Sequence, residues 1–171
     1  MAWLPNVVGP VFAEDRAPII SEERSFGGYA FFSIYKTADA RHVTLGGVEP
    51  KFARNLLTDL GRPDLLKTAI SPPGSTQDPL KAFLSETFER HTLQYWVKWF
   101  KNRDICFAPV LNLHEAWNSP QISAREMLLT DTQGNHHIGT PIKYRAEPGQ
   151  PNLSLPGLNE SGAQIRAEVK C

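Results

Sequence analysis

The residues best suited to chemistry lie together in one segment, Gly46-Gly47-Val48-Glu49-Pro50. Paired glycines let a backbone approach a ligand closely, and Pro50 suits the first position of a helix. On such a corner between a strand and a helix, Glu49 presents a carboxylate toward a cleft in a fixed geometry. On pattern alone the structural alternative carries more weight: the glycines form a turn, and the helix dipole stabilises the carboxylate.

The sequence offers no metal or nucleophile motif beside this segment. The five histidines show neither H-x-x-x-H nor H-E-x-x-H spacing, and the side chains of His136 and His137 would diverge on a strand. We therefore predict no metal site. No G-x-S-x-G, P-loop, G-x-G-x-x-G or catalytic cysteine signature is present. Cys106 lies in an apolar run and is predicted to be a buried thiol, whereas the terminal Cys171 is predicted to be exposed.

A β-hairpin is predicted to lead the chain into the glycine segment. Residues 29–36 are aromatic and β-rich and predict a strand, residues 37–40 have turn chemistry, and residues 41–46 alternate polar and apolar as a returning strand. Within the turn, Asp39 is able to hydrogen-bond the local backbone.

Three amphipathic helices are predicted after the hairpin. The first begins at Pro50 and stops at Gly61, the second begins at the Asp78-Pro79 pair, and the third is capped by Thr92. Their apolar faces are Phe52, Leu56, Leu57 and Leu60; Leu80, Phe83, Leu84 and Phe88; and Leu93, Trp96, Val97 and Phe100.

Later elements are shorter. Residues 105–111 predict a strand that Pro109 confines to an edge, and residues 114–117 predict a helical turn. Two more short strands are predicted, around residues 127–132 and 138–144.

The fold class is therefore α+β, with a hairpin or sheet and amphipathic helices in a small domain of residues 29–118. Residues 1–28 are predicted to be an irregular lead-in or linker. Residues 119–171, rich in proline and glycine, are predicted to be an irregular C-terminal segment that packs onto something else.

Composition narrows the function classes. The 18 Lys and Arg balance 18 Asp and Glu, so nothing favours nucleic acid or an anionic membrane as a partner. No apolar run approaches the ~20 residues that span a bilayer. The chain has no signal-peptide pattern and two cysteines, which fits a reducing, cytoplasmic setting.

Several stretches, taken together, resemble the family III CoA-transferases, the CaiB/BaiF group. Residues 35–41 resemble the family's Y-x-T-A-D-G-R, and residues 46–52 resemble its G-x-x-E-P-x-F. Weaker likenesses lie at residues 60–64, 108–111, 139–143 and 155–158. The order and spacing of the set make the resemblance specific, and it runs from about residue 28 to 165.

The sequence also departs from this family. Ala40 replaces the glycine of T-A-D-G, which predicts a turn that needs no positive φ there. Asn159-Glu160-Ser161 replaces part of the family's terminal motif. Nothing before Tyr29 resembles the large domain that carries the nucleophilic Asp and most of the CoA site, so the likeness is to the small domain and C-terminal return segment.

The resemblance implies a covalent relay. An Asp of the large domain attacks an acyl-CoA thioester, CoA thiolate attacks the resulting anhydride, and a carboxylic acid then takes over the CoA. Coenzyme A or acyl-CoA is thus a substrate, with no covalently bound cofactor. The partners implied are a large CoA-binding domain or subunit and, in the complete enzyme, a second copy in an interlocked homodimer.

In the family's racemase branch, the Glu of G-x-x-E-P supports a histidine that exchanges the proton next to the thioester. The resemblance gives this role to Glu49, as a supporting carboxylate in catalysis, and places Gly46 and Gly47 at the same cleft. The leading hypothesis is part of a CoA-transferase that is inactive alone. The alternatives are part of an acyl-CoA racemase, or a truncated, non-catalytic interaction module.

Overall fold

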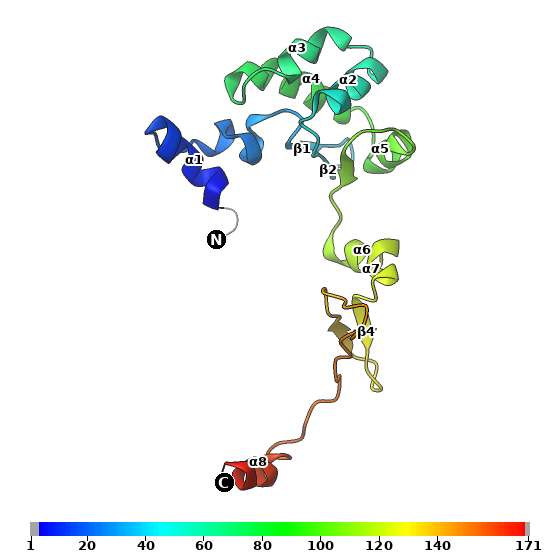
Figure 1. Ribbon diagram of the computed structural model, residues 1–171. Coiled ribbons are helices and arrows are strands. Elements are labelled where there is room, and N and C mark those ends of the chain that lie inside the picture. Colours follow the sequence, from blue (N-terminus) through cyan, green and yellow to red (C-terminus); the bar gives the residue numbers. More distant parts are fainter. Residues whose placement is uncertain (1–3, 170–171) are drawn as a thin grey trace. The chain divides into compact units, whose positions relative to one another are not determined.

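The computed structural model describes residues 4–169. The chain divides into two compact units, Met1–Val110 and Leu111–Cys171 (Figure 1). The predicted exposure of Cys171 falls on a residue outside the described range.

A three-stranded antiparallel sheet forms the centre of the first unit, in the order β1-β2-β3. Its strands are β1 (Ser33–Lys36), β2 (His42–Leu45) and β3 (Phe107–Pro109). The register pairs Ile34 with Thr44 and Thr44 with Ala108. The predicted hairpin and edge strand are confirmed. However, β1 starts later than predicted, because residues 29–32 form a turn in which the Phe32 amide donates to the Tyr29 carbonyl at 3.0 Å.

The predicted helices are confirmed in the first unit. Its helices are α1 (Leu4–Glu14), α2 (Pro50–Asp59), α3 (Leu66–Ala69), α4 (Asp78–Phe88) and α5 (Leu93–Phe100), with short turns η1 (Ile20–Glu22), η2 (Arg24–Gly28), η3 (Pro63–Leu65) and η4 (Ser75–Gln77). Gly61, at φ +71°, follows the end of α2. The Thr92 hydroxyl accepts from the Tyr95 amide and caps α5. Val97 is not on the buried face, because it lies about 100° around the helix from Trp96.

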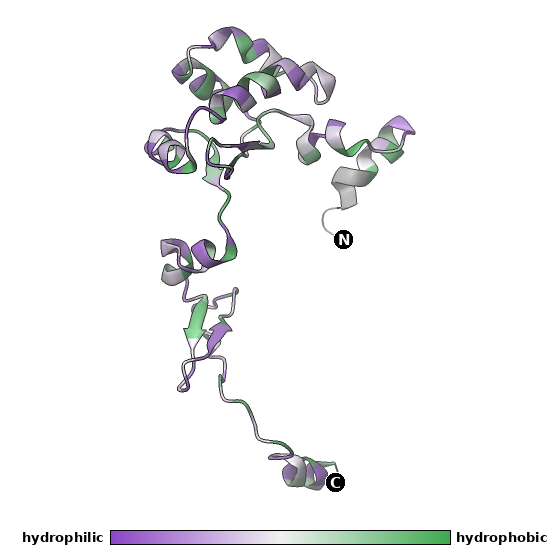
Figure 2. Cartoon of the chain, turned by 180° about the vertical axis from the view of Figure 1, so that it is seen from behind, coloured by the Kyte–Doolittle hydropathy of each residue, from purple (hydrophilic) through white to green (hydrophobic). Residues whose placement is uncertain are grey.

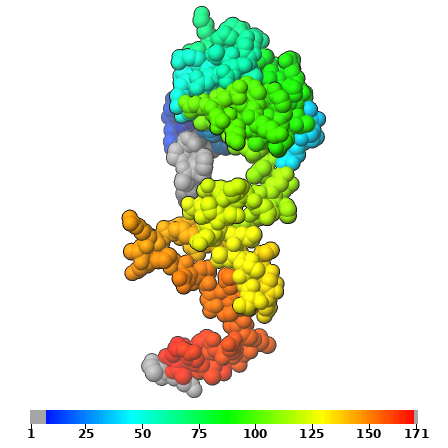
Figure 3. Space-filling view, turned by 90° about the vertical axis from the view of Figure 1, so that its right-hand side faces the viewer, coloured from blue at the N-terminus to red at the C-terminus, as the bar shows by residue number. Residues whose placement is uncertain are grey.

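One face of the sheet is buried under α4 and α5. Tyr35 of β1 stacks on Phe88 of α4 at 5.3 Å between ring centroids, and Phe88 meets Trp96 of α5 edge-on at 5.0 Å. Phe100 of α5 stacks on Phe107 of β3 at 3.9 Å. In Figure 3 the residues of α2 to α5, coloured cyan to green, form one continuous body. These aromatic contacts anchor the sheet, and thus β2, from which the glycine segment leaves.

The lead-in is more ordered than predicted. Residues 4–14 form α1, although Gly9 and Pro10 argued against a helix. Pro10 is buried, whereas Phe12 is 83% exposed, and local propensity is only a weak prior for or against a helix. The prediction of an irregular segment is therefore wrong for α1.

The second unit is built from short elements. They are α6 (Leu113–Trp117), α7 (Pro120–Ala124), β4 (Leu128–Thr130), β5 (His136–Ile138) and α8 (Gly162–Glu168), with β4 and β5 paired as an antiparallel hairpin. The helical turn and the hairpin are as predicted, but the strand predicted around residues 138–144 is wrong for most of its length, because β5 both begins and ends earlier. It begins earlier because the Asp131 carboxylate accepts from the amides of Gln133 and Asn135, at 2.8 and 2.9 Å, and closes a tight turn.

The second unit has no core comparable with the first. Among described residues 111–169, no hydrophobic side chain is buried. Figure 2 shows β4 as hydrophobic and β5 as hydrophilic. Across residues 4–169, no helix combines the length and apolar character needed to cross a membrane.

Candidate functional site

The glycine segment leaves the end of the central strand and is tied to its neighbour. The Gly46 amide donates to the Cys106 carbonyl at 3.0 Å. Gly47 is buried, and a Cβ there would lie 2.7 Å from Phe52 Cδ2 and 2.8 Å from Cys106 Cβ. Only glycine fits this contact between the corner, α2 and β3. For Gly47, therefore, the geometry favours the structural interpretation.

Glu49 occupies the N-cap position of α2. Its backbone is extended (φ −70°, ψ 136°), and its carbonyl accepts the Phe52 amide at 3.0 Å, which opens the helix. The side chain makes no capping hydrogen bond and is exposed. The fold thus fixes the backbone of Glu49 and leaves its carboxylate in solvent, near the positive end of the helix dipole.

Cys106 is not the buried thiol that its sequence context predicts. It is half-buried, because it lies where the chain enters β3 beside the glycine corner and not inside the sheet's covered face.

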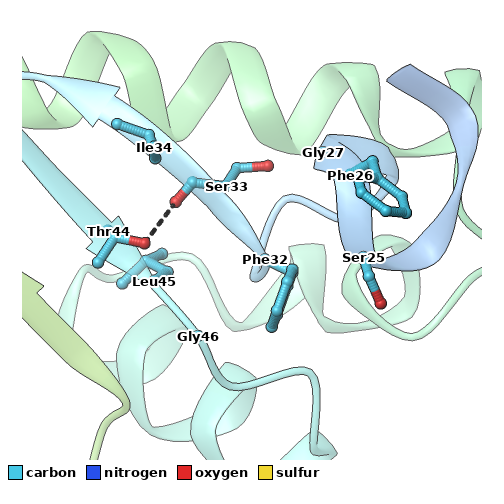
Figure 4. Close-up of a pocket in the computed structure, with 9 residues that line it drawn as sticks. All are labelled: Ser25, Phe26, Gly27, Phe32, Ser33, Ile34, Thr44, Leu45 and Gly46. Carbon is cyan, nitrogen blue, oxygen red and sulfur yellow. Dashed lines mark hydrogen bonds between the residues drawn. The ribbon is translucent and has the colours of Figure 1, made fainter. Parts of the chain in front are cut away.

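A hollow of about 520 Å³ lies beside this corner and includes Gly46. Nine residues line it: Ser25, Phe26, Gly27, Phe32, Ser33, Ile34, Thr44, Leu45 and Gly46 (Figure 4). Figure 4 shows Ser25 and Phe26 projecting from η2 and Phe32 from the segment that enters β1. Of the predicted site residues, Gly46 lines the hollow, whereas Gly47 and Glu49 do not.

The side of the hollow formed by η2 escaped the sequence predictions. Gly27 adopts φ +95°, and a Cβ on Gly28 would lie 2.5 Å from the carbonyl oxygens of Glu22 and Glu23. The Gly27-Gly28 pair was the available signal. The pair indicates a tight turn, but the sequence does not indicate which strand lies opposite that turn.

The Thr37-Ala38-Asp39 segment connects the hairpin turn to the start of α5. The Asp39 carboxylate accepts from the Thr37 hydroxyl at 2.6 Å and from the Leu93 amide, at the start of α5, at 3.1 Å. These bonds hold the pKa of Asp39 below its usual range, with the Thr37 bond the main cause. Ala40 has φ +57°, so the prediction that it avoids positive φ is wrong. The five-residue loop between paired Lys36 and His42 requires that conformation.

The histidines of the second hairpin point to separate partners. His136 Nδ1 lies 3.2 Å from the Thr130 hydroxyl, and His137 Nε2 lies 3.1 Å from the Asp131 carboxylate. The Asn135 side chain and His137 hold the pKa of Asp131 well below its usual range. Within residues 4–169, no three His, Cys, Asp or Glu side chains gather as metal ligands do.

Comparison with known proteins gives one consistent family. The chain matches the profile of CoA-transferase family III over residues 2–162. It is 32% identical to the alpha-methylacyl-CoA racemase of Mus musculus, a match that covers 61% of this chain and 27% of the racemase. It is 30% identical to the acetyl-CoA:oxalate CoA-transferase of Acetobacter aceti, covering 98% of this chain and 42% of that enzyme. The chain thus spans less than half the length of these curated relatives.

Solved structures agree on the fold. A CAIB/BAIF family protein from Brucella suis aligns with a TM-score of 0.67 at 22% identity, over 97% of this chain and 44% of its own. From its sequence match and its fold, the chain belongs to CoA-transferase family III.

Proposed function

We propose that this chain is part of an enzyme that transfers coenzyme A from an acyl-CoA thioester to a carboxylic acid. The family match over residues 2–162 carries the proposal. An aspartate outside these 171 residues attacks the thioester carbonyl and releases CoA thiolate. The thiolate attacks the anhydride, which releases the first acid and leaves an enzyme thioester. The acceptor carboxylate attacks the enzyme thioester, forms a second anhydride and releases CoA thiolate, which then attacks the acceptor's carbonyl to give the new acyl-CoA and free the aspartate.

In this proposal, residues 29–118 are the small domain and residues 119–171 return onto a large CoA-binding domain, with residues 1–28 as the connection. The large apolar side chains left exposed in residues 119–169 support a packing role for this segment: Leu155 is 84% exposed, Leu158 103% and Val169 78%. The complete enzyme would be a cytoplasmic homodimer.

Glu49 and Gly46 are proposed to face the cleft, and the buried Gly47 is proposed to belong to the same corner by packing between them against Phe52 and Cys106. Glu49 is held on a rigid corner while its carboxylate remains exposed and does not cap α2. A carboxylate in this position can accept a hydrogen bond from a histidine of the large domain. Such a bond fixes the tautomer of the imidazole and stabilises its charged form.

That arrangement makes racemisation the second candidate, because the imidazole would exchange the proton next to the thioester. The 32% identity to the Mus musculus racemase favours it. Here Glu49 is a positioning residue, since it acts through the histidine.

Isotope exchange between labelled CoA and acyl-CoA tests the transfer. The complete enzyme should catalyse the exchange, and the 171-residue chain alone should not, because the nucleophile lies elsewhere. Exchange by the chain alone would contradict this placement. A complete protein that exchanges neither CoA nor the α-proton would instead favour a non-catalytic interaction module.

Glu49→Gln tests the positioning role, with the exposed Glu86→Gln on α4 as a matched control. If racemisation occurs, Glu49→Gln should slow α-proton exchange by about tenfold or more, less than the roughly 100-fold or greater loss of a general base itself. The acidic limb of the pH profile should move to lower pH, because an imidazole without its carboxylate partner has a lower pKa. If the rate of α-proton exchange and its pH profile are unchanged, Glu49 has no positioning role, and its carboxylate only interacts with the dipole of α2.

A further inference from the structure

The hollow beside Gly46 exposes large apolar side chains that the core does not use. Ile34 is 65% exposed, and Phe26 and Phe32 are each 39% exposed, whereas the adjacent Phe31 is only 2% exposed. The three exposed residues line the same hollow (Figure 4). Apolar groups gathered around one concavity are typical of a ligand site, and about 520 Å³ lies within the ~300–1,000 Å³ of small-molecule pockets.

Of the three side-chain hydroxyls that line the hollow, those of Ser33 and Thr44 are already engaged, and that of Ser25 is the third. The Ser33 hydroxyl donates to the Tyr29 carbonyl at 2.7 Å, and the Thr44 hydroxyl donates to the Ser33 carbonyl at 3.4 Å. The Gly46 amide is bonded to Cys106. None of the described residues lining the hollow is charged. A carboxylate placed in the hollow would lose its hydrating water. It would find no cation and few hydrogen-bond donors there, so its desolvation would cost free energy.

The side of the hollow formed by η2 is held in place before any ligand arrives. The Gly28 carbonyl accepts the Gly74 amide at 3.0 Å. Buried Glu23 accepts from the Arg16 guanidinium at 2.6 Å and from the Ile19 amide at 3.1 Å. The Gln77 side chain accepts the Ala30 amide at 3.3 Å, just beyond the turn. Such bracing lowers the conformational entropy lost on binding.

We propose that this hollow receives the acyl chain of the thioester substrate, and that the chain is apolar and uncharged. The inference rests on the proposed function and names its substrate class. Gly46 connects the hollow to the glycine corner, so the thioester carbonyl would lie toward Gly46 and the hydrocarbon tail between Phe26, Phe32 and Ile34. A short dicarboxylic acyl group such as oxalyl does not fit these surroundings.

The test measures kcat/KM for CoA exchange in the complete enzyme with octanoyl-CoA, acetyl-CoA and oxalyl-CoA. Octanoyl-CoA should exceed oxalyl-CoA by about tenfold or more, since a few methylenes in an apolar pocket are worth 10- to 200-fold. Ile34→Ala should lower the octanoyl value by about tenfold and the acetyl value by less than about threefold. Ile70→Ala, at a side chain 56% exposed and outside the hollow, is the matched control and should change neither.

A second variant tests charge. Ile34→Lys, on an exposed face of the sheet, should lower the octanoyl value and raise the oxalyl value relative to the parent enzyme, because the ammonium offers a partner to the carboxylate. Its unfolding midpoint reports whether the fold is kept.

The outcomes separate the two proposals. If no thioester is exchanged, the proposed function fails and this inference falls with it. If exchange occurs but oxalyl-CoA is preferred, or Ile34→Ala behaves like Ile70→Ala, the acyl-chain site alone is overturned.

Discussion

At the scale of single residues, Gly47 links the candidate site to stability. Any Cβ at this position meets Phe52 and Cys106 at less than 3 Å. We expect Gly47→Ala to lower the free energy of unfolding by about 1–3 kcal/mol, as overpacking does in other cores. Urea unfolding measures the change. Gly46→Ala, with nothing within 4 Å of its Cβ, is the control and should shift stability by less than about 0.5 kcal/mol.

Asp39 makes part of the stability depend on pH. Its pKa is lowered in the folded state, chiefly by the Thr37 hydroxyl and also by the Leu93 amide. The stabilisation is therefore present above the unfolded pKa of about 3.9 and is lost as pH falls through the lower folded pKa. Asp39→Asn should unfold at a lower urea concentration than the parent at pH 7, and the difference should narrow by pH 3. A constant difference across this range would show that the charge does not matter.

At the scale of elements, the hairpin turn carries strain at Ala40. A left-handed conformation costs an L-residue roughly 1–2 kcal/mol, which glycine avoids while losing roughly 0.5–1 kcal/mol of backbone entropy. Ala40→Gly should therefore raise the free energy of unfolding by about 0.5–1 kcal/mol, measured by thermal or urea unfolding. Ala38→Gly, in the same turn without positive φ, should give no gain.

Local sequence signals predicted those helices whose ends carry a capping residue, a proline or a glycine. Pro50 and Gly61 frame α2, and Thr92 caps α5, so both were predictable. Helix α7 has the same Ser119-Pro120 start but is only five residues long, too short for a periodic apolar face. Helix α1 was missed because Pro10 obscured it.

The candidate site was predictable in one half only. The corner with Gly46 and Glu49 follows from adjacent residues, whose spacing is visible in the sequence. The opposite side of the hollow depends on hydrogen bonds that Gly74 makes to Gly28, at the end of η2, and that Gln77 makes to Ala30, just after it. Contacts across more than forty residues leave no local pattern.

At the scale of the whole molecule, stability is concentrated in the first unit. Every buried hydrophobic side chain among the described residues belongs to residues 30–100. We expect native-state hydrogen exchange to protect the amides of core residues such as Leu56, Leu84 and Trp96 to the global limit. Amides of residues 111–169 should exchange through local opening in the isolated chain. Equal protection in both units would contradict this division.

The hydrogen bond from the Leu93 amide to Asp39 also bears on the order of folding. It closes a loop of 54 residues, and the entropic cost of closure is repaid only when α2 to α4 have folded between its ends. We therefore expect the hairpin and the helices to acquire local structure before the bond between Asp39 and Leu93 forms. Losing the carboxylate should accelerate unfolding more than it slows folding, which makes this hydrogen bond a control on how long the native state persists.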